Sequence, residues 1–367
     1  MAILMDIILY GAVFFAVLYA IAHFYLRGRN LSVYDTPIPV TFDSAGPSEA
    51  ANGVTDYLLE RMSKPETLEA TRNRFNEMGL SREFDCTFLP GTAEYDGLSV
   101  PGEWTLVEGA DPAKRLLYIH GGAFMLGSPI SHRPIIVNIA KRTGCAVFAP
   151  DYRLMPENRR KDSILDSRAA YHWVLENGPH GPAPLDKISV AGDSAGGNLT
   201  LCLVNWLRDS GHRMPDAVVA LSPATDTTGS GPSIRGNLET DHMLRRLAAP
   251  MLKLPTWLLM WIVWATNRIR PSSKLISPLH DDLHGLPPTL IHVSTTEILY
   301  DDAKRYTNKA VSHGSPVKLQ TWAHLCHVWQ AFDEMLPEAT HAFDEIAAFM
   351  HEHDVSKEKH PNPPAAD

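Results

Sequence analysis

Apolar runs alternate with segments of helical spacing along most of this chain. The apolar runs lie at 104–107, 115–119, 145–149, 188–192, 217–221, 289–293 and 317–321. Short runs of this kind are typical of strands that are buried on both faces of a sheet. Strands that alternate with helices predict an α/β fold, with a mostly parallel sheet and helices on both faces.

The N-terminal segment departs from this alternation. Residues 7–26 are apolar except at Gly11 and His23, and as a helix they would cross a hydrocarbon layer of about 30 Å. Arg27 and Arg29 follow the run, whereas a secretory signal needs positive charge before it. We therefore expect an uncleaved single-pass membrane anchor within residues 1–29. A cleaved signal or a hydrophobic helix docked on the rest of the protein is the alternative.

The same two arginines indicate the orientation of such an anchor. Lysine and arginine accumulate on the cytoplasmic side of membrane helices, so the rest of the chain is expected in the cytoplasm. At the other end of the chain, residues 351–367 combine charges with three prolines, which predicts a disordered tail.

Composition and charge exclude some classes of function. The chain has 367 residues and is 44% hydrophobic, which is ample for one large α/β core. Its net charge of −9 offers no basic surface, so we expect no nucleic-acid partner. The four cysteines are scattered without the spacing of zinc ligands, so we expect no metal.

The strongest chemical motif follows the strand at 188–192. Residues 192–196 read Gly-Asp-Ser-Ala-Gly, and a helix-compatible stretch begins at Asn198. In this strand–turn–helix context the turn would expose the hydroxyl of Ser194 above the sheet, as a nucleophile requires. Small residues at 192 and 196 are needed because a Cβ at either position would collide with the tight turn. By itself, the pentapeptide also fits a glycine-rich phosphate-binding turn.

A second motif follows the strand at 115–119. Residues 120–124 read His-Gly-Gly-Ala-Phe, and two glycines at a strand end let backbone N–H groups turn toward one point. Such donors form an oxyanion hole, which stabilises the negative charge of a tetrahedral acyl intermediate. The candidate donors are Gly121, Gly122 and Ala123, together with Ala195 beside the serine.

An acid and a histidine follow the last two predicted strands. Glu297 and Asp301 come after the strand at 289–293, and His327 follows the strand at 317–321. The chain order serine, acid, histidine is the order expected of α/β-hydrolases.

Together these segments resemble the hormone-sensitive-lipase-like branch of the α/β-hydrolase esterases. The resemblance covers about residues 85–350 and rests on residues 120–124, 151–157, 192–197, 277–279, 285–288 and 327–329. It implies an α/β-hydrolase fold with a helical cap, no cofactor, and a preference for short acyl chains. The family usually has a third glycine where this chain has Ala123, and alanine should serve unless that residue needs a positive φ.

The resemblance also implies the choice of acid and base. The family places its acid thirty residues before the histidine, as Glu297 stands before His327. Asp301 remains the alternative acid, although it and Asp302 are expected to begin the next helix, where carboxylates favour the N-terminal dipole. His324 is the rival base, and the family pattern favours His327 because it directly precedes Val-Trp.

These interpretations predict a membrane-anchored carboxylic-ester hydrolase that acts on short- to medium-chain or lipophilic esters. Ser194, Glu297 and His327 would form its triad. An amidase or deacetylase, or a lipid acyl-hydrolase, would use the same groups. A non-catalytic ligand-binding relative is disfavoured because His327 is present.

Beyond the anchor we expect three parts in the chain, the last of which is the tail at 351–367. Residues 30–85 would be a connector with N-terminal cap helices, and 86–350 the catalytic domain. A cap insertion is expected at about 238–270. Within it, 252–269 are rich in tryptophan but short for a membrane span. That stretch would be a buried or cap-packing helix, an acyl-pocket wall or a helix in the membrane interface.

Overall fold

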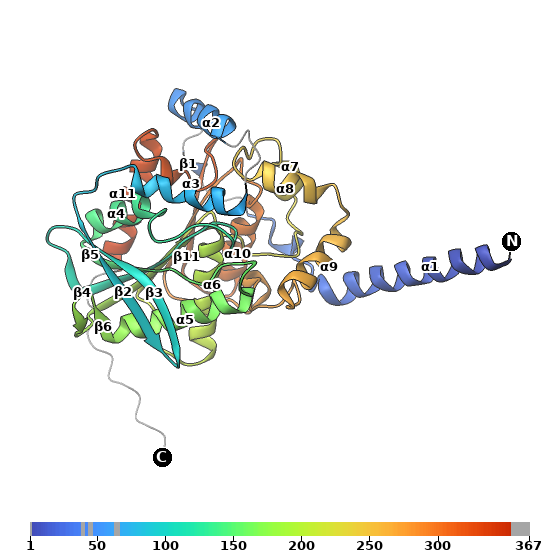
Figure 1. Ribbon diagram of the computed structural model, residues 1–367, viewed down its shortest axis with the longest axis horizontal. Coiled ribbons are helices and arrows are strands. Elements are labelled where there is room, and N and C mark those ends of the chain that lie inside the picture. The colour runs from blue at the N-terminus through green and yellow to red at the C-terminus, as the bar shows by residue number, and fades with distance from the viewer. Residues whose placement is uncertain (1, 38–40, 43–46, 62–66, 354–367) are drawn as a thin grey trace, which may run out of the picture.

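A nine-stranded sheet forms the centre of the molecule (Figure 1). The computed structural model describes residues 2–37, 41–42, 47–61 and 67–353. The strands of the sheet are β1 Thr41–Phe42, β2 Thr87–Tyr95, β3 Leu98–Leu106, β4 Asp111–Ile119, β5 Cys145–Pro150, β8 Lys187–Asp193, β9 Ala217–Leu221, β10 Thr289–Ser294 and β11 Val317–Trp322. Their order is β1-β11-β10-β9-β8-β4-β5-β3-β2. All pairs are parallel except β2–β3 and β3–β5.

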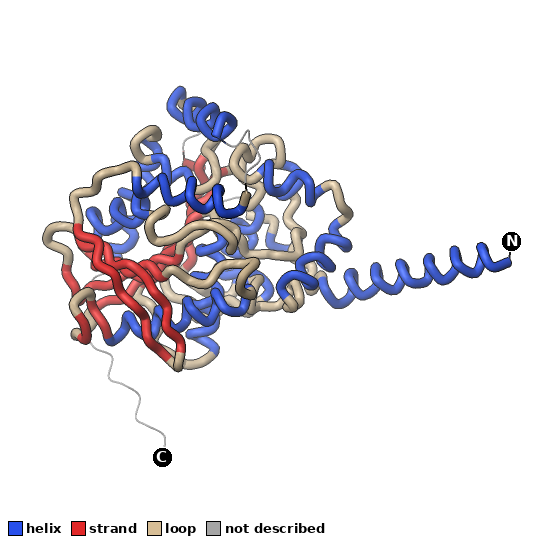
Figure 2. Tube along the Cα trace, viewed as in Figure 1, coloured by secondary structure: helices blue, strands red, loops and turns tan. Residues whose placement is uncertain are grey.

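Helices surround this sheet, with helices and strands coloured separately in Figure 2. They are α1 Ala2–Ile21, α2 Glu49–Arg61, α3 Leu68–Leu80, α4 Arg133–Thr143, α5 Arg160–Glu176, α6 Ser194–Asp209, α7 Ser233–Gly236, α8 Arg245–Leu252, α9 Thr256–Asn267, α10 Tyr300–Ser312 and α11 Pro337–Glu352. A π turn, Ala22–Leu26, continues α1, and short 3-10 turns lie at Ser32–Tyr34, Pro278–His280 and Trp329–Phe332. A small ribbon pairs β6 Asn177–Gly178 with β7 Gly181–Pro182.

Both faces of the sheet are buried, as the apolar runs predicted. Along β4, Leu117 and Ile119 pack in one core cluster with residues of α5 and α6. The alternate residues Leu116 and Tyr118 pack in another cluster with residues of α4 and α11. Helix α10 covers the first face farther along, against β9 and β10. This arrangement confirms the expected mostly parallel sheet with helices on both sides.

The outer strands differ from the sequence-based expectation. Strand β2 was not predicted, and it lies at the edge of the sheet with Pro90 and Gly91 at its centre. Both residue types weaken the strand signal, and an edge strand tolerates them because one side makes no ladder. Within residues 30–85, where N-terminal helices were expected, the structure has two helices, α2 and α3.

Helix α1 projects away from the body of the protein, and its apolar side chains are largely exposed (Figure 1). Together with the π turn it is long and apolar enough to cross a membrane, although an N-terminal signal sequence has the same properties. Within the predicted cap insertion, α8 and α9 meet at an angle of 113°. Met260 is the one buried residue of α9, so its tryptophans remain partly accessible.

Candidate active site

Ser194 lies at the point where β8 gives way to α6. Its φ of 51° is left-handed, a conformation that costs a side-chain-bearing residue about 1–2 kcal/mol. The neighbouring glycines make the turn possible. A Cβ on Gly192 would lie 2.6 Å from the Ile119 carbonyl oxygen, and one on Gly196 would lie 1.9 Å from that same atom. The sequence-based requirement for small residues at both positions therefore has a direct steric cause.

Replacing Gly196 by alanine is expected to destabilise the protein by about 3 kcal/mol or more, since the added methyl group meets rigid backbone. Thermal unfolding of the variant measures this loss. Gly53→Ala in the exposed part of α2 is the matched control, because nothing lies within 4 Å of its new Cβ. The control should gain up to about 1 kcal/mol of helix stability. Equal stability of the two variants would contradict the steric account.

Three side chains from three loops meet at the carboxyl ends of the strands. His327 Nε2 lies 2.9 Å from Ser194 Oγ, and His327 Nδ1 lies 2.5 Å from Glu297 Oε2. The histidine and the glutamate are buried, whereas the serine is partly accessible. The structure thus brings together the three residues that the sequence singled out, with the histidine between the serine and the acid.

Further hydrogen bonds fix the second oxygen of the Glu297 carboxylate. Ser222 Oγ donates to Oε1 at 2.8 Å, and the Ser294 N–H donates to it at 2.6 Å. The sequence analysis did not identify these two serines. Ser222 directly follows β9 and Ser294 ends β10, so their position at the same edge of the sheet was the available signal.

The buried pair has shifted pKa values. Burial raises the pKa of Glu297, and the adjacent His327 only partly opposes this. Burial lowers the pKa of His327, but the Glu297 carboxylate offsets this effect, and the net pKa is raised above the ordinary value. A neutral imidazole flanked by a carboxylate and a hydroxyl is the arrangement that general-base chemistry requires.

The rival residues lie elsewhere. Asp301 is in the first turn of α10, as expected, where it accepts a hydrogen bond from the Ser233 N–H and pairs with Lys304. His324 is exposed to solvent. Neither is hydrogen-bonded to Ser194 or His327 in the described part of the chain.

Asp302, beside the rival acid, is buried with a raised pKa. Its Oδ2 accepts hydrogen bonds from the N–H groups of Thr225 and Asp226 at 2.7 and 2.8 Å. Burial, followed by the nearby Asp226 carboxylate, raises the pKa of Asp302 to about 8. Between the unfolded value near 3.9 and this folded value, only the native state keeps the proton, so stability falls as pH rises.

Asp302→Asn removes that proton linkage. The stability of the variant relative to the parent should therefore rise between pH 5 and pH 8, on the order of 1 kcal/mol per pH unit. Urea unfolding of both proteins across this range measures the difference. A constant offset between the two proteins would show that Asp302 is ionised throughout.

The loop after β4 lies beside the serine turn, in contact with Asp193 and Gly196. Gly122, Ala123 and Phe124 all have positive φ, with values of 117°, 53° and 62°. Alanine at position 123 therefore adopts the conformation that would suit glycine. Neither Gly122 nor Ala123 donates a backbone hydrogen bond to another group in the part of the chain that the structure describes.

The N–H of Gly121 has a different partner. It donates to Asp193 Oδ1 at 2.9 Å, and the Tyr118 hydroxyl donates to the same oxygen at 2.8 Å. This contact occupies the only N–H of Gly121, so that residue is not a free donor. Asp193 therefore holds the loop after β4 against the serine turn.

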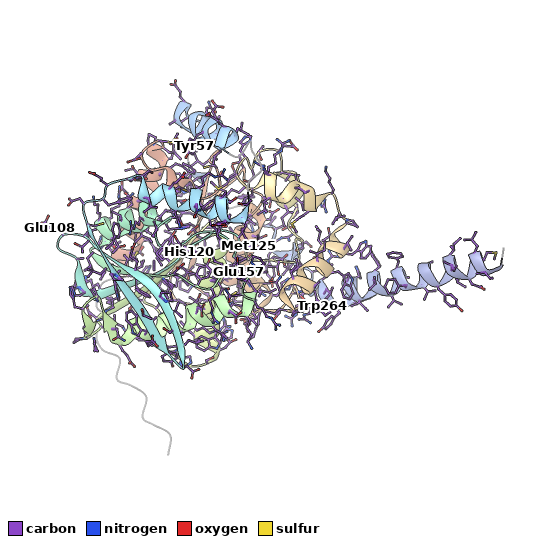
Figure 3. The ribbon with its side chains drawn as sticks, in the orientation of Figure 1. Tyr57, Glu108, His120, Met125, Glu157 and Trp264 are labelled. Atoms are coloured by element: carbon purple, nitrogen blue, oxygen red, sulfur yellow. The ribbon has the colours of Figure 1, made fainter. Side chains whose placement is uncertain are left out.

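Neighbouring segments fix the same loop. The Tyr152 hydroxyl donates to the His120 carbonyl at 2.8 Å. From α3, Arg72 donates to the Met125 carbonyl and forms an ion pair with Glu157. His120, Met125 and Glu157 lie close to one another in the view of Figure 3. Helix α3 thus supports the loop beside the serine turn.

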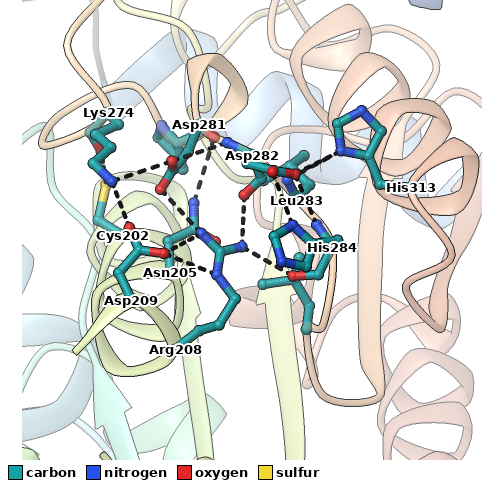
Figure 4. A network of polar contacts seen from close by, with 12 residues as sticks. Cys202, Asn205, Arg208, Asp209, Lys274, Asp281, Asp282, Leu283, His284 and His313 are labelled. Atoms are coloured by element: carbon teal, nitrogen blue, oxygen red, sulfur yellow. Dashed lines mark hydrogen bonds and ion pairs between the residues drawn. The ribbon is translucent and has the colours of Figure 1, made fainter. Parts of the chain in front are cut away.

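The far end of the serine helix is held by a polar network (Figure 4). Arg208 of α6 donates to the carbonyls of Asp282 and His284 and pairs with Asp209. Lys274 bridges Asp209 and Asp281. These contacts join α6 to the 274–284 loop and so fix the helix that begins at Ser194.

Comparison with known proteins agrees with this geometry. Residues 116–331 match the family described as alpha/beta hydrolase fold. An acetyl-hydrolase of Streptomyces hygroscopicus is 36% identical over 253 residues, which are 68% of this chain and 78% of that protein. The chain belongs to the α/β-hydrolase family. Within this family it is an esterase-type serine hydrolase of the hormone-sensitive-lipase-like branch.

Other α/β-hydrolases support that placement. The carboxylesterase/phospholipase LipF of Mycobacterium tuberculosis is 34% identical over 66% of this chain and 64% of its own length. The crystal structure of an esterase from the bacterial hormone-sensitive lipase family superimposes with a TM-score of 0.72 at 33% identity. That alignment covers 84% of this chain and 99% of the other.

Proposed function

We propose that the protein hydrolyses carboxylic esters with Ser194 as nucleophile, His327 as general base and Glu297 as the orienting acid. The single observation that supports this most is the continuous hydrogen-bonded series from Ser194 Oγ through the imidazole to the Glu297 carboxylate. The names of the relatives, acetyl-hydrolase and carboxylesterase, agree with this reaction class.

The first half of the proposed reaction forms an acyl-enzyme. His327 Nε2 takes the hydroxyl proton as Ser194 Oγ attacks the ester carbonyl. The resulting oxyanion accepts hydrogen bonds from the N–H groups of Gly122, Ala123 and Ala195, whereas Gly121 is excluded by its bond to Asp193. The imidazolium then gives its proton to the leaving alcohol.

In the second half water replaces the alcohol. His327 takes a proton from the water, which attacks the acyl carbonyl, and returns that proton to Ser194 Oγ as the carboxylic acid leaves. Throughout, Glu297 stabilises the imidazolium and keeps the Nδ1 proton toward itself. Besides the ester and water, both halves of the proposed reaction use only side chains and backbone N–H groups of this chain.

For the substrate we propose esters of short to medium acyl chains, or lipophilic esters with a small acyl group. A series of aryl esters from acetyl to palmitoyl, assayed on the full chain in detergent, tests this proposal. We expect the highest kcat/KM at the short end.

A labelling experiment with an organophosphonate, read by mass spectrometry, should place the adduct on Ser194. Label on another residue, or none, would contradict the assignment.

We also propose that α1 and its π turn anchor the enzyme in a membrane, with the catalytic part in the cytoplasm. The apolar length of Ile3–Leu26 and the arginines after it support this assignment.

We also propose a division into domains. Residues 30–85 would join the anchor to the catalytic domain at 86–350, with the cap insertion near 238–270. Most of the tail expected at 351–367 lies outside the described residues.

A further inference from the structure

Positive charge gathers in the two sequence segments that meet where α1 joins the rest of the protein. Residues 7–34 and 242–280 contain eight lysines and arginines, and all 42 acidic residues of this net-negative chain lie elsewhere. The eight are Arg27, Arg29, Arg245, Arg246, Lys253, Arg268, Arg270 and Lys274. Of these, Arg245 pairs with Glu239, and Lys274 pairs with Asp209 and Asp281. Two segments more than 200 positions apart therefore share a composition that suits an anionic partner.

The structure joins these two segments. Ala22 and Leu26 pack on Met260, and the Trp261 indole N–H donates to the Leu18 carbonyl at 3.0 Å. In Figure 1, α9 lies at the base of the projecting α1, and Trp264 is labelled there in Figure 3.

Two further contacts strengthen the junction. The guanidinium of Arg270 lies 5.2 Å from the centre of the Tyr25 ring. Gly28, with φ 74°, approaches the loop after α9 so closely that a Cβ would lie 2.5 Å from Ser272 Cβ. Helix α1 is therefore fixed to the catalytic body rather than tethered by a loose linker.

The accessible residues at this junction have the character of a membrane interface. On α8, Leu247 and Met251 are one turn apart and are 54% and 42% exposed. Arg246 and Lys253 are exposed next to them. On α9, Trp257, Trp261 and Trp264 are partly accessible. Tryptophan beside arginine and lysine is the combination that favours the boundary between acyl chains and headgroups.

We propose that α8, α9 and the last turns of α1 form one surface that rests on the headgroup layer of an anionic membrane. The occupant is the lipid surface, because the junction continues the proposed anchor and its charge complements anionic headgroups. A cavity of about 420 Å³ opens there, lined by Tyr19, His23, Arg27 and Trp257 together with the 228–232 loop. Its size and its arginine suit a phospholipid headgroup.

This surface is linked directly to the proposed catalytic acid. Just before α8, Asp241 accepts hydrogen bonds from the N–H groups of Leu244 and Ile298, each at 2.9 Å. The Asn237 amide donates to the carbonyls of Thr295 and Glu297. Contact between α8 and the membrane would therefore hold the loop of the acid close to the bilayer, where lipophilic esters concentrate. This consequence rests on the proposed function.

Tryptophan fluorescence tests the contact with the membrane. The full chain is placed in nanodiscs whose acyl chains are brominated near the glycerol end, so that only tryptophans at the interface are quenched. We expect quenching in the parent and a loss of most of it in Trp257→Phe/Trp264→Phe. The control, Trp173→Phe/Trp206→Phe, changes two partly accessible tryptophans of α5 and α6 and should keep it. Equal quenching in both variants, or none in the parent, would overturn the proposal.

A second comparison tests the charge. Quenching should be greater in an equal mixture of phosphatidylcholine and phosphatidylserine than in phosphatidylcholine alone. Arg246→Gln/Lys253→Gln/Arg268→Gln should remove that increase. Lys141→Gln/Lys161→Gln/Lys318→Gln, an equal change of charge at exposed positions of other elements, should preserve it. Loss of the increase in both variants would refute a local role for the junction.

These measurements do not depend on catalysis. They give the same result with the Ser194→Ala chain if the surface acts as proposed. Failure of ester hydrolysis and failure of membrane contact are therefore distinguished, since each has its own readout.

Discussion

Ser194→Ala is expected to lower kcat for ester hydrolysis by about a million-fold. Alanine removes the oxygen that attacks the carbonyl, while the imidazole and the oxyanion donors remain without a nucleophile to assist. Residual catalysis of about a thousand-fold over water would remain, from the oxyanion hole and substrate binding. Steady-state hydrolysis of a short aryl ester, with burst-phase detection of the acyl-enzyme, measures the change.

We expect the Ser194→Ala variant to keep the fold of the parent. Position 194 has a left-handed φ with either side chain, and the one hydrogen bond lost is the bond to His327. We expect the free energy of unfolding to change by no more than about 1 kcal/mol. Retention of more than one per cent of the activity would exclude Ser194 as the nucleophile.

Glu297→Gln is expected to reduce kcat by about a thousand- to ten-thousand-fold. The amide can still accept hydrogen bonds from Ser222 and Ser294 through its oxygen. Its NH2 group then faces His327 Nδ1 and donates to it, which forces the ring proton onto Nε2. In that tautomer the imidazole cannot take the serine proton.

The pH profile gives an independent check on the same residue. In the parent, kcat/KM should fall as the pH drops through a His327 pKa that lies above the ordinary value, since only the neutral imidazole acts as a base. Without the Glu297 carboxylate, burial, which lowers that pKa, is opposed only by the weaker effects of Asp241 and Asp193. The acidic limb of the Glu297→Gln profile should therefore move to lower pH.

Asp301→Asn is the matched control for the acid. The Asp301 carboxylate accepts a hydrogen bond from Ser233 and pairs with Lys304, and it does not contact the histidine. The variant should therefore keep activity within a few-fold of the parent. Full activity in Glu297→Gln together with a large loss in Asp301→Asn would make the assignment of the acid wrong.

The catalytic geometry was predictable because the chemistry lies directly after strands. In a parallel sheet the carboxyl ends of all strands meet at one edge, so motifs after β4, β8, β10 and β11 had to converge there. For Ser194 the strand–turn–helix context was sufficient, whereas His327 was preferred to His324 because of the resemblance to a known family. The resemblance to a known family chose between Glu297 and Asp301, and the structure places these two side chains as that choice expects.

The supporting contacts could not be predicted in the same way. Arg72 reaches the loop after β4 from a helix 53 positions away along the chain. The bond from Gly121 to Asp193 depends on the register between two neighbouring strands. Neither contact leaves a periodic or compositional signal, because each is produced by packing between distant segments. For the same reason the sequence suggested Gly121 as an oxyanion donor, although its amide is already engaged.

The absence of a side chain at Gly196 has a consequence for protein engineering. At this residue the backbone of the serine turn packs directly against the backbone at the end of β4, next to the carbonyls of Ile119 and His120. No side chain separates the two segments, so mutagenesis of the surrounding pocket does not alter their spacing. A directed-evolution library that leaves Gly196 unchanged and randomises positions outside the two turns should therefore change which esters are accepted while the turnover chemistry persists.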